Sequence, residues 1–409
     1  MDTQKPAYIQ TEEQNSQERA AVLQKVLIGH LGVQDAFVRE GKDEQGKTTF
    51  FASIVPSAEA AFPVLQLLRL RKLDAFSQLQ TTELPNGMVI AEHNQFETES
   101  LYKEIFEKRV YARHDIRLPD SACIVDVGAN IGLGSLFFSQ HCKNPSIYAF
   151  EPGPSIYALL KMNVSLYGLN AQIFNYALSK ESGTRMFTAY TFCSPMSGFF
   201  SDAEEGKAVI KDMLVAEYLQ GQEDDFVPTE MIEQMLVAAL TNEQIPCRME
   251  TLSYVIEEQG LEVIDLLKLD AEKSELDILE GIKEEHWPKI KQIVMEVHGS
   301  EAFLQEIVQL LEQHEYALII GKDPIFKRSG LYELYAYQRG TSAERAGKSL
   351  EESQPASSYR WSSAARLIKD IRAMADIQSL TDPSTLEIMV VEQLPGQQNG
   401  SVDQDSLSL

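Results

Sequence analysis

The stretch IVDVGANIG at residues 124–132 decides the predicted fold. The small and β-branched residues of Cys123–Val127 predict a buried strand, and the apolar segment Gly132–His141 predicts a helix directly behind it. Between them, glycines at 128 and 132 allow a tight turn and let a ligand approach the backbone amides at the helix N-terminus. A strand, a glycine turn and a helix in this order are typical of a nucleoside-binding α/β sheet.

The same alternation continues along the chain on the C-terminal side of this turn. Further strands are predicted at Ser146–Phe150, Ile173–Tyr176, Ile264–Leu269 and Gln292–Val297, with longer helical segments between them. Strands that alternate with helices of about 10–15 residues imply crossover units. We therefore predict an α/β, doubly wound parallel sheet with helices on both faces.

Composition and charge narrow the function classes. The 409 residues include 44% hydrophobic and 24% charged residues, which excludes a disordered or collagen-like chain. The formal net charge of −25 argues against general binding to nucleic acid or anionic membranes. Four scattered cysteines are expected to be reduced thiols, and neither a secretion signal nor an apolar run of ~18 residues is evident. The sequence therefore predicts a soluble cytoplasmic protein.

The glycine spacing favours one class of nucleoside ligand. A dinucleotide fingerprint needs G-x-G-x-x-G, but Asn130 holds the place of its second glycine. The spacing instead suits a nucleoside that carries a small zwitterion, with Asp126 facing its ammonium group and the turn Gly128–Gly132 cradling its amino-acid part. Glu151, at the end of the next strand, can bind both ribose hydroxyls. These features predict S-adenosyl-L-methionine as the cofactor of a methyltransferase.

Residues at the ends of two later strands are the candidate catalytic groups. His298 follows a predicted strand and is the expected general base, with Glu296 on the same face to orient it. A strand-end histidine satisfied by a backbone carbonyl is the alternative. Asp270 ends the preceding strand and is expected near the reacting centre, on the same face as Lys268, which is buried by pattern. Pairing with a carboxylate and the absence of such a partner are the two alternatives for Lys268.

Two glutamates begin the helix after Asp270. Glu272 is a candidate catalytic residue, whereas Glu275 has helix capping as a complete alternative. The group His298, Glu296, Asp270 and Glu272 has the composition of an oxygen-rich divalent-metal site, but its spacing does not require one, so no metal is predicted.

Several motifs resemble the FkbM family of S-adenosylmethionine-dependent methyltransferases over about residues 97–338. They are VDVGANIG, YAFEP, NYALS, IDLLKLDAEKSELDILEGI and IVMEVHG. The segments EIFEKRVYARHDIRLP, SPMSGFF, HWPKI and LYELYA resemble members of polyketide and nonribosomal peptide assembly lines, which methylate oxygen. Lys273 replaces the glycine of the usual D-x-E-G-x-E motif, so a sugar acceptor is not carried over.

The resemblance implies a Rossmann-like class I methyltransferase fold and a set of cofactor-binding residues. That set is Asp126, Gly128, Ala129, Asn130, Gly132, Glu151, Asn163, Ala177, Asp270, Tyr102 and Tyr111.

The flanks resemble the two ends of the small C-terminal subdomain of an adenylation domain. VLIGHLGVQDAFVREGKDEQGKTTFFASIVPS resembles its start and MVVEQLPGQQNGSVDQDSLSL its final motif, in which Ser401 takes the place of the catalytic lysine. A neutral hydroxyl cannot stabilise an adenylate phosphate as a charge would, so this subdomain is expected to be a small, degenerate α+β relic.

These observations divide the chain into consecutive parts. They are a disordered lead (1–19), the first half of the degenerate adenylation subdomain (20–60), a helical lid segment (61–118), the methyltransferase domain (119–340), a linker (341–360) and the second half of the subdomain (361–409). Within the methyltransferase domain, 194–250 is predicted to be a strand-free helical insertion that serves as a lid or substrate wall, with a surface subdomain as the alternative.

The combined prediction is methyl transfer to a hydroxyl or enol oxygen. The expected acceptor is a polyketide or peptide intermediate tethered by phosphopantetheine to an acyl or peptidyl carrier protein, with neighbouring synthase modules as partners. The basic residues Arg69, Arg71 and Lys72 are one candidate docking patch, with a solvated helix face as the alternative. Methylation of a free sugar hydroxyl or amide nitrogen, and a non-catalytic interaction module, are the competing predictions.

Overall fold

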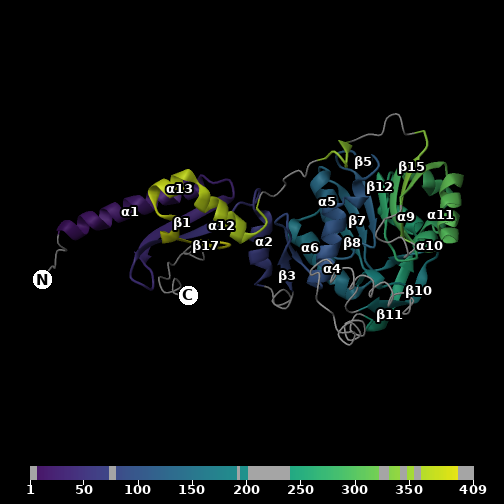
Figure 1. Ribbon diagram of the computed structural model, residues 1–409, viewed down its shortest axis with the longest axis horizontal. Coiled ribbons are helices and arrows are strands. Elements are labelled where there is room, and N and C mark those ends of the chain that lie inside the picture. Colours follow the sequence, from purple (N-terminus) through teal and green to yellow (C-terminus); the bar gives the residue numbers. More distant parts are fainter. Residues whose placement is uncertain are drawn as a thin grey trace, which may run out of the picture. The chain divides into compact units, whose positions relative to one another are not determined.

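The chain folds into two compact units (Figure 1). The larger unit is Ala91–Ala356, and the smaller unit combines Met1–Ile90 with Ser357–Leu409. The computed structural model describes residues 7–72, 80–190, 194–200, 240–321, 331–340, 348–353 and 361–394. Among these residues, no helix combines the length and apolar character that crossing a bilayer requires.

The smaller unit is an α+β fold to which both ends of the chain contribute. Its elements are α1 (Ala7–Ile28), β1 (Val33–Lys42), β2 (Thr48–Pro56), α2 (Phe62–Leu70), β3 (Thr81–Glu83), α12 (Ala364–Ala373), α13 (Ala375–Leu380) and β17 (Leu386–Val390). Strand β2 pairs antiparallel with β1 and parallel with β17. Buried Leu27, Ile54 and Leu367 belong to one hydrophobic core that joins the two chain segments.

Two predicted boundaries in this unit are wrong. The lead expected to be disordered over 1–19 is helical from Ala7, where α1 begins. The first residues of this helix are mostly polar, so the sequence shows no helical period of apolar residues there. The segment 61–118 was predicted to be one lid, but it divides, and α2 belongs to the smaller unit. Strand β4 (Val89–Ala91) follows β3 after the turn that contains Gly87, and the two strands pair as a two-stranded sheet.

Seven strands form the central sheet of the larger unit. In spatial order they are β14 (Tyr316–Gly321), β15 (Leu331–Gln338), β13 (Gln292–His298), β12 (Leu266–Leu269), β6 (Cys123–Val127), β7 (Ser146–Phe150) and β8 (Ala171–Phe174). The chain order reverses at β6, which has β7 on one side and β12 on the other. The predicted doubly wound α/β class is confirmed, and such a reversal is where ligands bind in open α/β sheets.

The parallel arrangement is confirmed for the five predicted strands, and the sheet also contains an antiparallel strand that was not predicted. Strand β15 runs antiparallel to both β13 and β14, whereas the strand pairs from β13 to β8 are parallel. Since β14 and β15 follow each other without a crossover helix among the described residues, they pair as an antiparallel hairpin.

The two faces of the central sheet carry different side chains. Val125, Leu267 and Met295 lie on one face, in a hydrophobic core with α9 (Leu252–Gln259), α10 (Glu275–Glu280) and α11 (Glu301–Gln313). The next residue of each strand, Asp126 in β6, Lys268 in β12 and Glu296 in β13, points to the other face because strand side chains alternate. Helix α5 (Leu133–His141) covers that face, while α6 (Pro154–Tyr167) connects β7 with β8.

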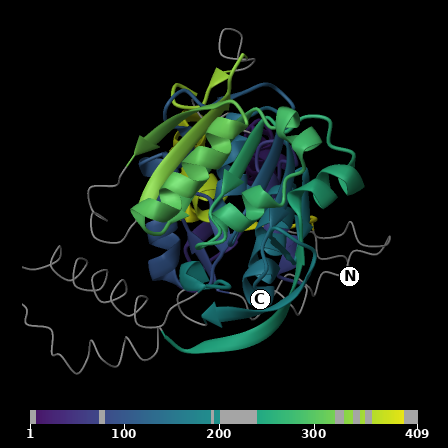
Figure 2. The ribbon, with the colours of Figure 1, turned by 90° about the vertical axis from the view of Figure 1, so that its right-hand side faces the viewer.

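A separate sheet occupies part of the predicted helical insertion. Strand β11 (Asn242–Glu250) pairs antiparallel with β10 (Gly183–Tyr190) and parallel with β9 (Ala177–Leu178). Figure 2 shows β10 and β11 as a long ribbon, teal and green, that extends from the central sheet. The strand-free prediction for 194–250 is therefore wrong at β11, whose exposed charges and Pro246 hide the strand pattern. Residues 201–239 lie outside the described part.

The segment before β6 contains short helices, and the described part of the predicted linker, residues 348–353, contains a short strand. Within the predicted helical segment 61–118, α4 (Gln95–Tyr102) is followed by a π-helical turn, Lys103–Glu107, and then by a short 3-10 helix, Val110–Ala112. Within the predicted linker 341–360, β16 (Lys348–Ser349) pairs with β5 (Arg117–Leu118). The Arg109 guanidinium donates to the Leu350 carbonyl over 2.5 Å and so fixes this part of the chain.

Replacing Gly128 with alanine tests how tightly β6 and β12 close on each other. An alanine Cβ at this position would lie 1.8 Å from the Asp270 carbonyl oxygen, and the residue has φ +70°. Gly260 is the matched control because it has φ +62° with nothing within 4 Å. We expect Gly260→Ala to lower the free energy of unfolding by about 1–2 kcal/mol, and Gly128→Ala by about 2–3 kcal/mol more, in urea denaturation. Equal losses would contradict the close contact.

Candidate active site

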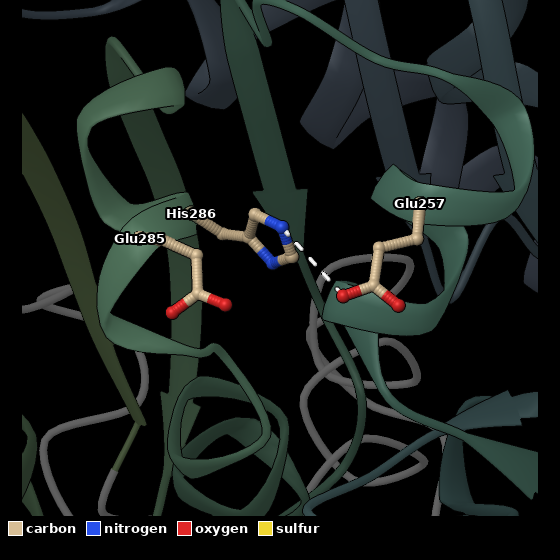
Figure 3. Close-up of side chains that lie close together, drawn as sticks. All are labelled: Glu257, Glu285 and His286. Carbon is tan, nitrogen blue, oxygen red and sulfur yellow. Dashed lines mark ion pairs between the residues drawn. The ribbon is translucent and has the colours of Figure 1, made fainter.

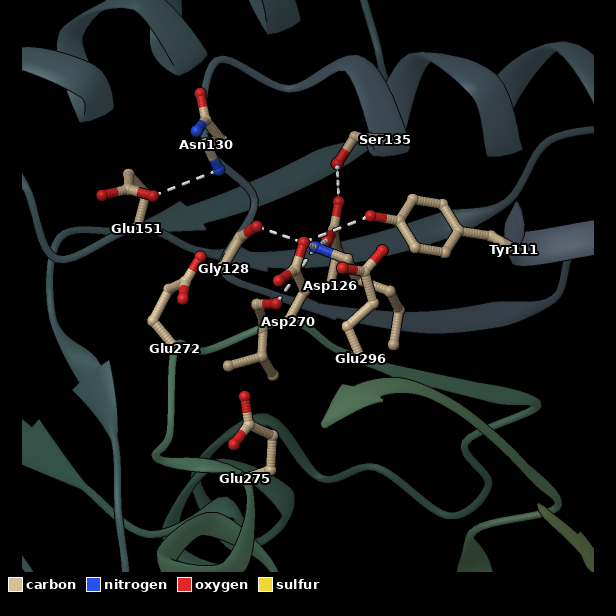
Figure 4. Close-up of polar contacts among 12 residues, drawn as sticks. Tyr111, Asp126, Gly128, Asn130, Ser135, Glu151, Asp270, Glu272, Glu275 and Glu296 are labelled. Atoms are coloured by element: carbon tan, nitrogen blue, oxygen red, sulfur yellow. Dashed lines mark hydrogen bonds and ion pairs between the residues drawn. The ribbon is translucent and has the colours of Figure 1, made fainter. Parts of the chain in front are cut away.

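A cavity lies at the carboxyl ends of β6, β7 and β12. Its walls include Gly128 after β6, Glu151 after β7 and Asp270 after β12. Figure 4 shows the carboxylates of Asp126, Asp270 and Glu296 gathered in this region. Of the predicted catalytic residues, Lys268, Asp270 and Glu272 line the cavity together with the predicted cofactor turn. Glu296 and His298 are not among the lining residues, and His298 reaches the cavity wall through Glu272.

The turn after β6 has an alternating left-handed backbone. Gly128, Asn130 and Gly132 have φ values of +70°, +49° and +94°. Asparagine tolerates this conformation, which explains how it occupies the place of a second glycine. The N–H groups of residues 128–132 all donate within the protein, the first two to the Phe150 carbonyl, so the expectation that they are open to a ligand is wrong. A ligand would instead meet the first turn of α5, where helix amides have no intrahelical partner.

The side chain of Lys268 holds the backbone of this turn in place. Its buried Nζ donates to the Gly128 carbonyl over 2.7 Å and lies 3.2 Å from Asp126 Oδ1 and 3.7 Å from Asp270 Oδ2. Burial alone would lower the pKa of Lys268, but Asp126 and Asp270 raise it above its ordinary value. The side chain is therefore an ammonium ion, and its predicted pairing with a carboxylate is observed.

Asp126 lies behind the cavity wall. Its side chain is fully buried, and the Ser135 hydroxyl donates to its Oδ2 over 2.7 Å. Together with Lys268, this hydroxyl takes the place of the ligand ammonium that the sequence analysis expected Asp126 to face.

Glu151, a buried carboxylate, lines the cavity at the end of β7, whereas Asp270 lines it at the end of β12. Its Oε1 accepts from the Gly153 N–H over 2.8 Å and its Oε2 from the Asn130 N–H over 3.1 Å. Burial raises the pKa of Glu151 to about 7, against the lowering effect of these two backbone donors. Its ionisation is therefore sensitive to pH near neutrality and to any further hydrogen-bond donor that enters the cavity.

His298 lies among carboxylates from two elements. Its Nδ1 is 3.2 Å from Glu275 Oε1, while its Nε2 is 3.6 Å from Glu272 Oε2 and 4.0 Å from Glu296 Oε2. The carboxylate that holds Nδ1 is therefore Glu275, whose side chain is completely buried, and not Glu296 as predicted. The alternative of a backbone carbonyl partner is not what the structure shows.

These contacts shift the acid–base properties of the whole group. Burial by itself would lower the pKa of His298, but Glu272 and Glu275 raise it to about 10. Burial, with the like charges of Asp270 and Glu275, raises the pKa of Glu272 to about 8 despite His298. Burial, together with Glu104 and Asp270, also raises the pKa of Glu296. At neutral pH the imidazole is therefore protonated.

The remaining predicted cofactor residues are divided between the cavity wall and the layer behind it. Ala129, Ala177 and Tyr111 line the cavity, and the Tyr111 hydroxyl donates to Asp270 Oδ2 over 3.3 Å. Tyr102 stacks on Phe106 and is not part of the wall.

Asn163 and Gly132 shape the turn from behind. The buried Asn163 side chain donates to the carbonyls of Ala91 and Ile131 over 2.9 and 2.8 Å. A Cβ on Gly132 would lie 2.9 Å from Leu160.

Among the residues that the structure describes, two groups of side chains have ligand atoms within 4.8 Å of one another, the spacing of a possible metal site. One is Asp270, Glu296 and His298, where Lys268 and the imidazole already supply positive charge. The other is Glu257, Glu285 and His286 (Figure 3), where Lys283 pairs with Glu257. Of the six residues in these two groups, Asp270 alone lines the cavity.

Sequence reasoning missed three residues of this site. Ser135, Glu97 and Ser194 make buried polar contacts with Asp126 or Asn130. Each lies in an apolar or mixed stretch where a serine or a glutamate has ordinary helix and loop explanations, so no local pattern identifies it.

Comparisons with known proteins agree on one family. The profile described as "Methyltransferase FkbM domain" matches residues 126–318. The 31-O-demethyl-FK506 methyltransferase FkbM of Streptomyces tacrolimicus is 35% identical over 260 residues, which cover 63% of this chain and 96% of that protein. The methyltransferase sdnD of Sordaria araneosa is 32% identical over 54% of this chain and 82% of its own length.

A much longer protein also matches. The AMB antimetabolite synthetase AmbE of Pseudomonas aeruginosa is 32% identical over 335 residues, which are 80% of this chain but 16% of AmbE. The profile match, residues 126–318, contains Gly128, Glu151 and Asp270 of the cavity described above. The chain therefore belongs to the FkbM family of methyltransferases.

Proposed function

We propose that this chain transfers a methyl group from S-adenosyl-L-methionine to a hydroxyl or enol oxygen of a polyketide or peptide intermediate bound to a carrier protein. The observation that carries the proposal is that Glu151, Asp270 and Glu272 line the same cavity and that His298 Nε2 lies 3.6 Å from Glu272 Oε2. One end offers a carboxylate for a ribose, and the other offers proton-transfer groups for an acceptor.

The residues present fit this cofactor. Buried Glu151 can accept hydrogen bonds from both ribose hydroxyls, as strand-end carboxylates do in nucleotide-binding sheets. The apolar side chains of Phe150, Tyr176 and Leu178 provide a surface for the adenine ring. Asp270 supplies negative charge at the wall where a sulfonium would lie. When bound, the cofactor supplies an electrophilic methyl group, and the protein has only to align the acceptor and remove its proton.

His298 is the proposed general base, acting through Nε2. Glu275 holds Nδ1, so Nε2 faces Glu272, which lines the cavity. An imidazolium cannot accept a proton, so Nε2 must first release one. Glu272 is the nearest carboxylate to Nε2, and in its ionised form, which prevails above its pKa of about 8, it is the proposed acceptor of that proton. A positioned base of this kind contributes about 10²–10⁴-fold to the rate.

The flanks support a carrier-bound acceptor. The larger unit contains 266 residues, so a 335-residue match to AmbE extends into the smaller unit. This chain therefore shares both parts with a segment of a much longer synthetase. Ser401, expected at the place of the adenylation lysine, lies outside the described residues. Arg69 and Lys72 both pair with Glu392, which reduces the positive charge of the candidate docking patch.

A free acceptor is the second candidate. The 31-O-demethyl-FK506 methyltransferase is named for an oxygen methylation, and this chain covers 96% of it without needing the flanks of AmbE. This relative supports the oxygen acceptor in either case, and it makes the carrier the point to be tested.

Intact-mass spectrometry of carrier proteins distinguishes these candidates. Carrier proteins loaded with hydroxyacyl groups are incubated with enzyme and S-adenosyl-L-methionine. We expect a mass gain of one CH₂ group on the hydroxyacyl load and none on its deoxy analogue. Equal turnover of a free hydroxyacyl thioester would favour the free acceptor, and no transfer to any oxygen would overturn the proposal.

The Glu272→Gln substitution tests the proposed base. Because kcat/KM reports the free enzyme, we expect it to rise with pH toward the raised pKa of His298, about 10. Glu272 is the main cause of the raised pKa of His298, so removing its carboxylate should lower that pKa. The acidic limb of the kcat/KM profile should therefore move to lower pH. Glu257→Gln, which alters a glutamate outside the cavity, is the control and should leave the profile unchanged. An unshifted limb in Glu272→Gln contradicts the assignment.

Glu151 predicts a pH dependence of cofactor binding. Only the ionised carboxylate accepts both ribose hydroxyls, and its pKa in the ligand-free fold is about 7. Affinity for S-adenosylhomocysteine should therefore fall by up to about tenfold for each pH unit below 7, in calorimetric titrations. Glu151→Gln should bind weakly at every pH, without this slope. In the ligand-free protein the sign is opposite: the fold holds a proton that the unfolded chain releases, so stability declines as pH rises from 4.5 to about 7.

A further inference from the structure

Residues 194–200 form one wall of the cavity. Ser194, Ser197, Gly198 and Phe199 all line it. The segment is attached to the end of β10: Gly198 and Thr188 exchange two backbone hydrogen bonds of 3.1 Å, and the Tyr190 N–H donates to Ser197 Oγ over 2.9 Å. Its C-terminal half is therefore fixed to the separate β-sheet.

The N-terminal end of this segment is held by Glu97 of α4. The Ser194 N–H donates to Glu97 Oε2 over 3.2 Å, and the Ser194 hydroxyl donates to Glu97 Oε1. The Asn130 side-chain amide also donates to Ser194 Oγ, over 3.0 Å. Glu97 and Ser194 are buried, at 6% and 8% exposure, so water does not replace these bonds. Three segments that are far apart in sequence thus meet at one serine.

The segment contacts both ends of the cavity. Asn130, which binds Ser194 through its side chain, donates its backbone N–H to Glu151 Oε2. At the other end, Gly198 lies so close to Glu272 that an added Cβ would be 3.3 Å from the Glu272 carbonyl oxygen. The position of 194–200 is therefore coupled to the ribose carboxylate on one side and to the partner of His298 on the other.

We infer that Ser194 is a positioning residue whose bonds to Glu97 hold segment 194–200 closed over a bound nucleoside cofactor. The cofactor leaves only when these bonds break. This inference rests on the proposed cofactor, since it assigns Ser194 a role in retaining that ligand. Glu97 accepts from Ser194 through both of its carboxyl oxygens, so the backbone and the side chain of Ser194 are held by one residue.

The dissociation rate of S-adenosylhomocysteine tests the inference. In stopped-flow displacement, Ser194→Ala should release the ligand about tenfold faster, which corresponds to ~1.4 kcal/mol. Ser194→Thr, which keeps a hydroxyl, should restore most of the wild-type rate. Ser182→Ala is the matched control, because Ser182 also donates to a glutamate, Glu250, over 2.5 Å, but neither residue lines the cavity. A rate for Ser194→Ala within twofold of wild type, in a folded protein, overturns the inference.

Amide hydrogen exchange separates this inference from the proposed function. In the ligand-free protein, Glu97→Gln should speed exchange across 194–200, while exchange in β6 stays at its wild-type rate. This measurement needs no cofactor. If the wild-type protein binds no S-adenosylhomocysteine, the proposed function fails, whereas unchanged exchange in Glu97→Gln means that the bonds to Glu97 do not hold the segment.

Discussion

The buried ammonium of Lys268 is the interaction on which the site depends. It lies between the carboxylates of Asp126 and Asp270 and donates to the carbonyl of Gly128. It therefore links the ends of β6 and β12, at the point in the sheet where the chain order of the strands reverses. Removing one partner from a buried ion pair costs about 3–5 kcal/mol because the other charge is left uncompensated. The turn that borders the cavity has its shape because this cation is underneath it.

An excess of negative charge follows from the same arrangement. Lys268 and His298 are the cations that the structure places among Asp126, Asp270, Glu272, Glu275 and Glu296. Burial makes uncompensated carboxylates expensive, which explains why the pKa values of Glu272 and Glu296 are raised. The same carboxylates hold His298 in its protonated form. A reaction that needs the neutral imidazole of His298 therefore depends on which group accepts the imidazolium proton.

Much of the fold was readable from the sequence, and the failures have physical causes. The strands Cys123–Val127 and Ser146–Phe150 match their predicted bounds because they are short, buried and flanked by turn residues. Strand β11 was missed because it is largely exposed and carries charges, so burial imposes no apolar pattern. In the site, Asp126 was expected at the ligand, but its partners Lys268 and Ser135 come from other elements, and residue spacing does not report such tertiary pairings.

The parallel pairing of β2 with β17 has a consequence for biosynthesis. Phe50 lies opposite Leu386, so the whole larger unit is translated between the two halves of one small sheet. Domains generally fold as they emerge from the ribosome, at about 5–20 residues per second. The larger unit can thus acquire its structure while β1 and β2 wait with an unpaired edge, and the sheet is completed only when the last strand leaves the exit tunnel. Until β17 covers it, such an edge is a template for pairing with strands of other chains.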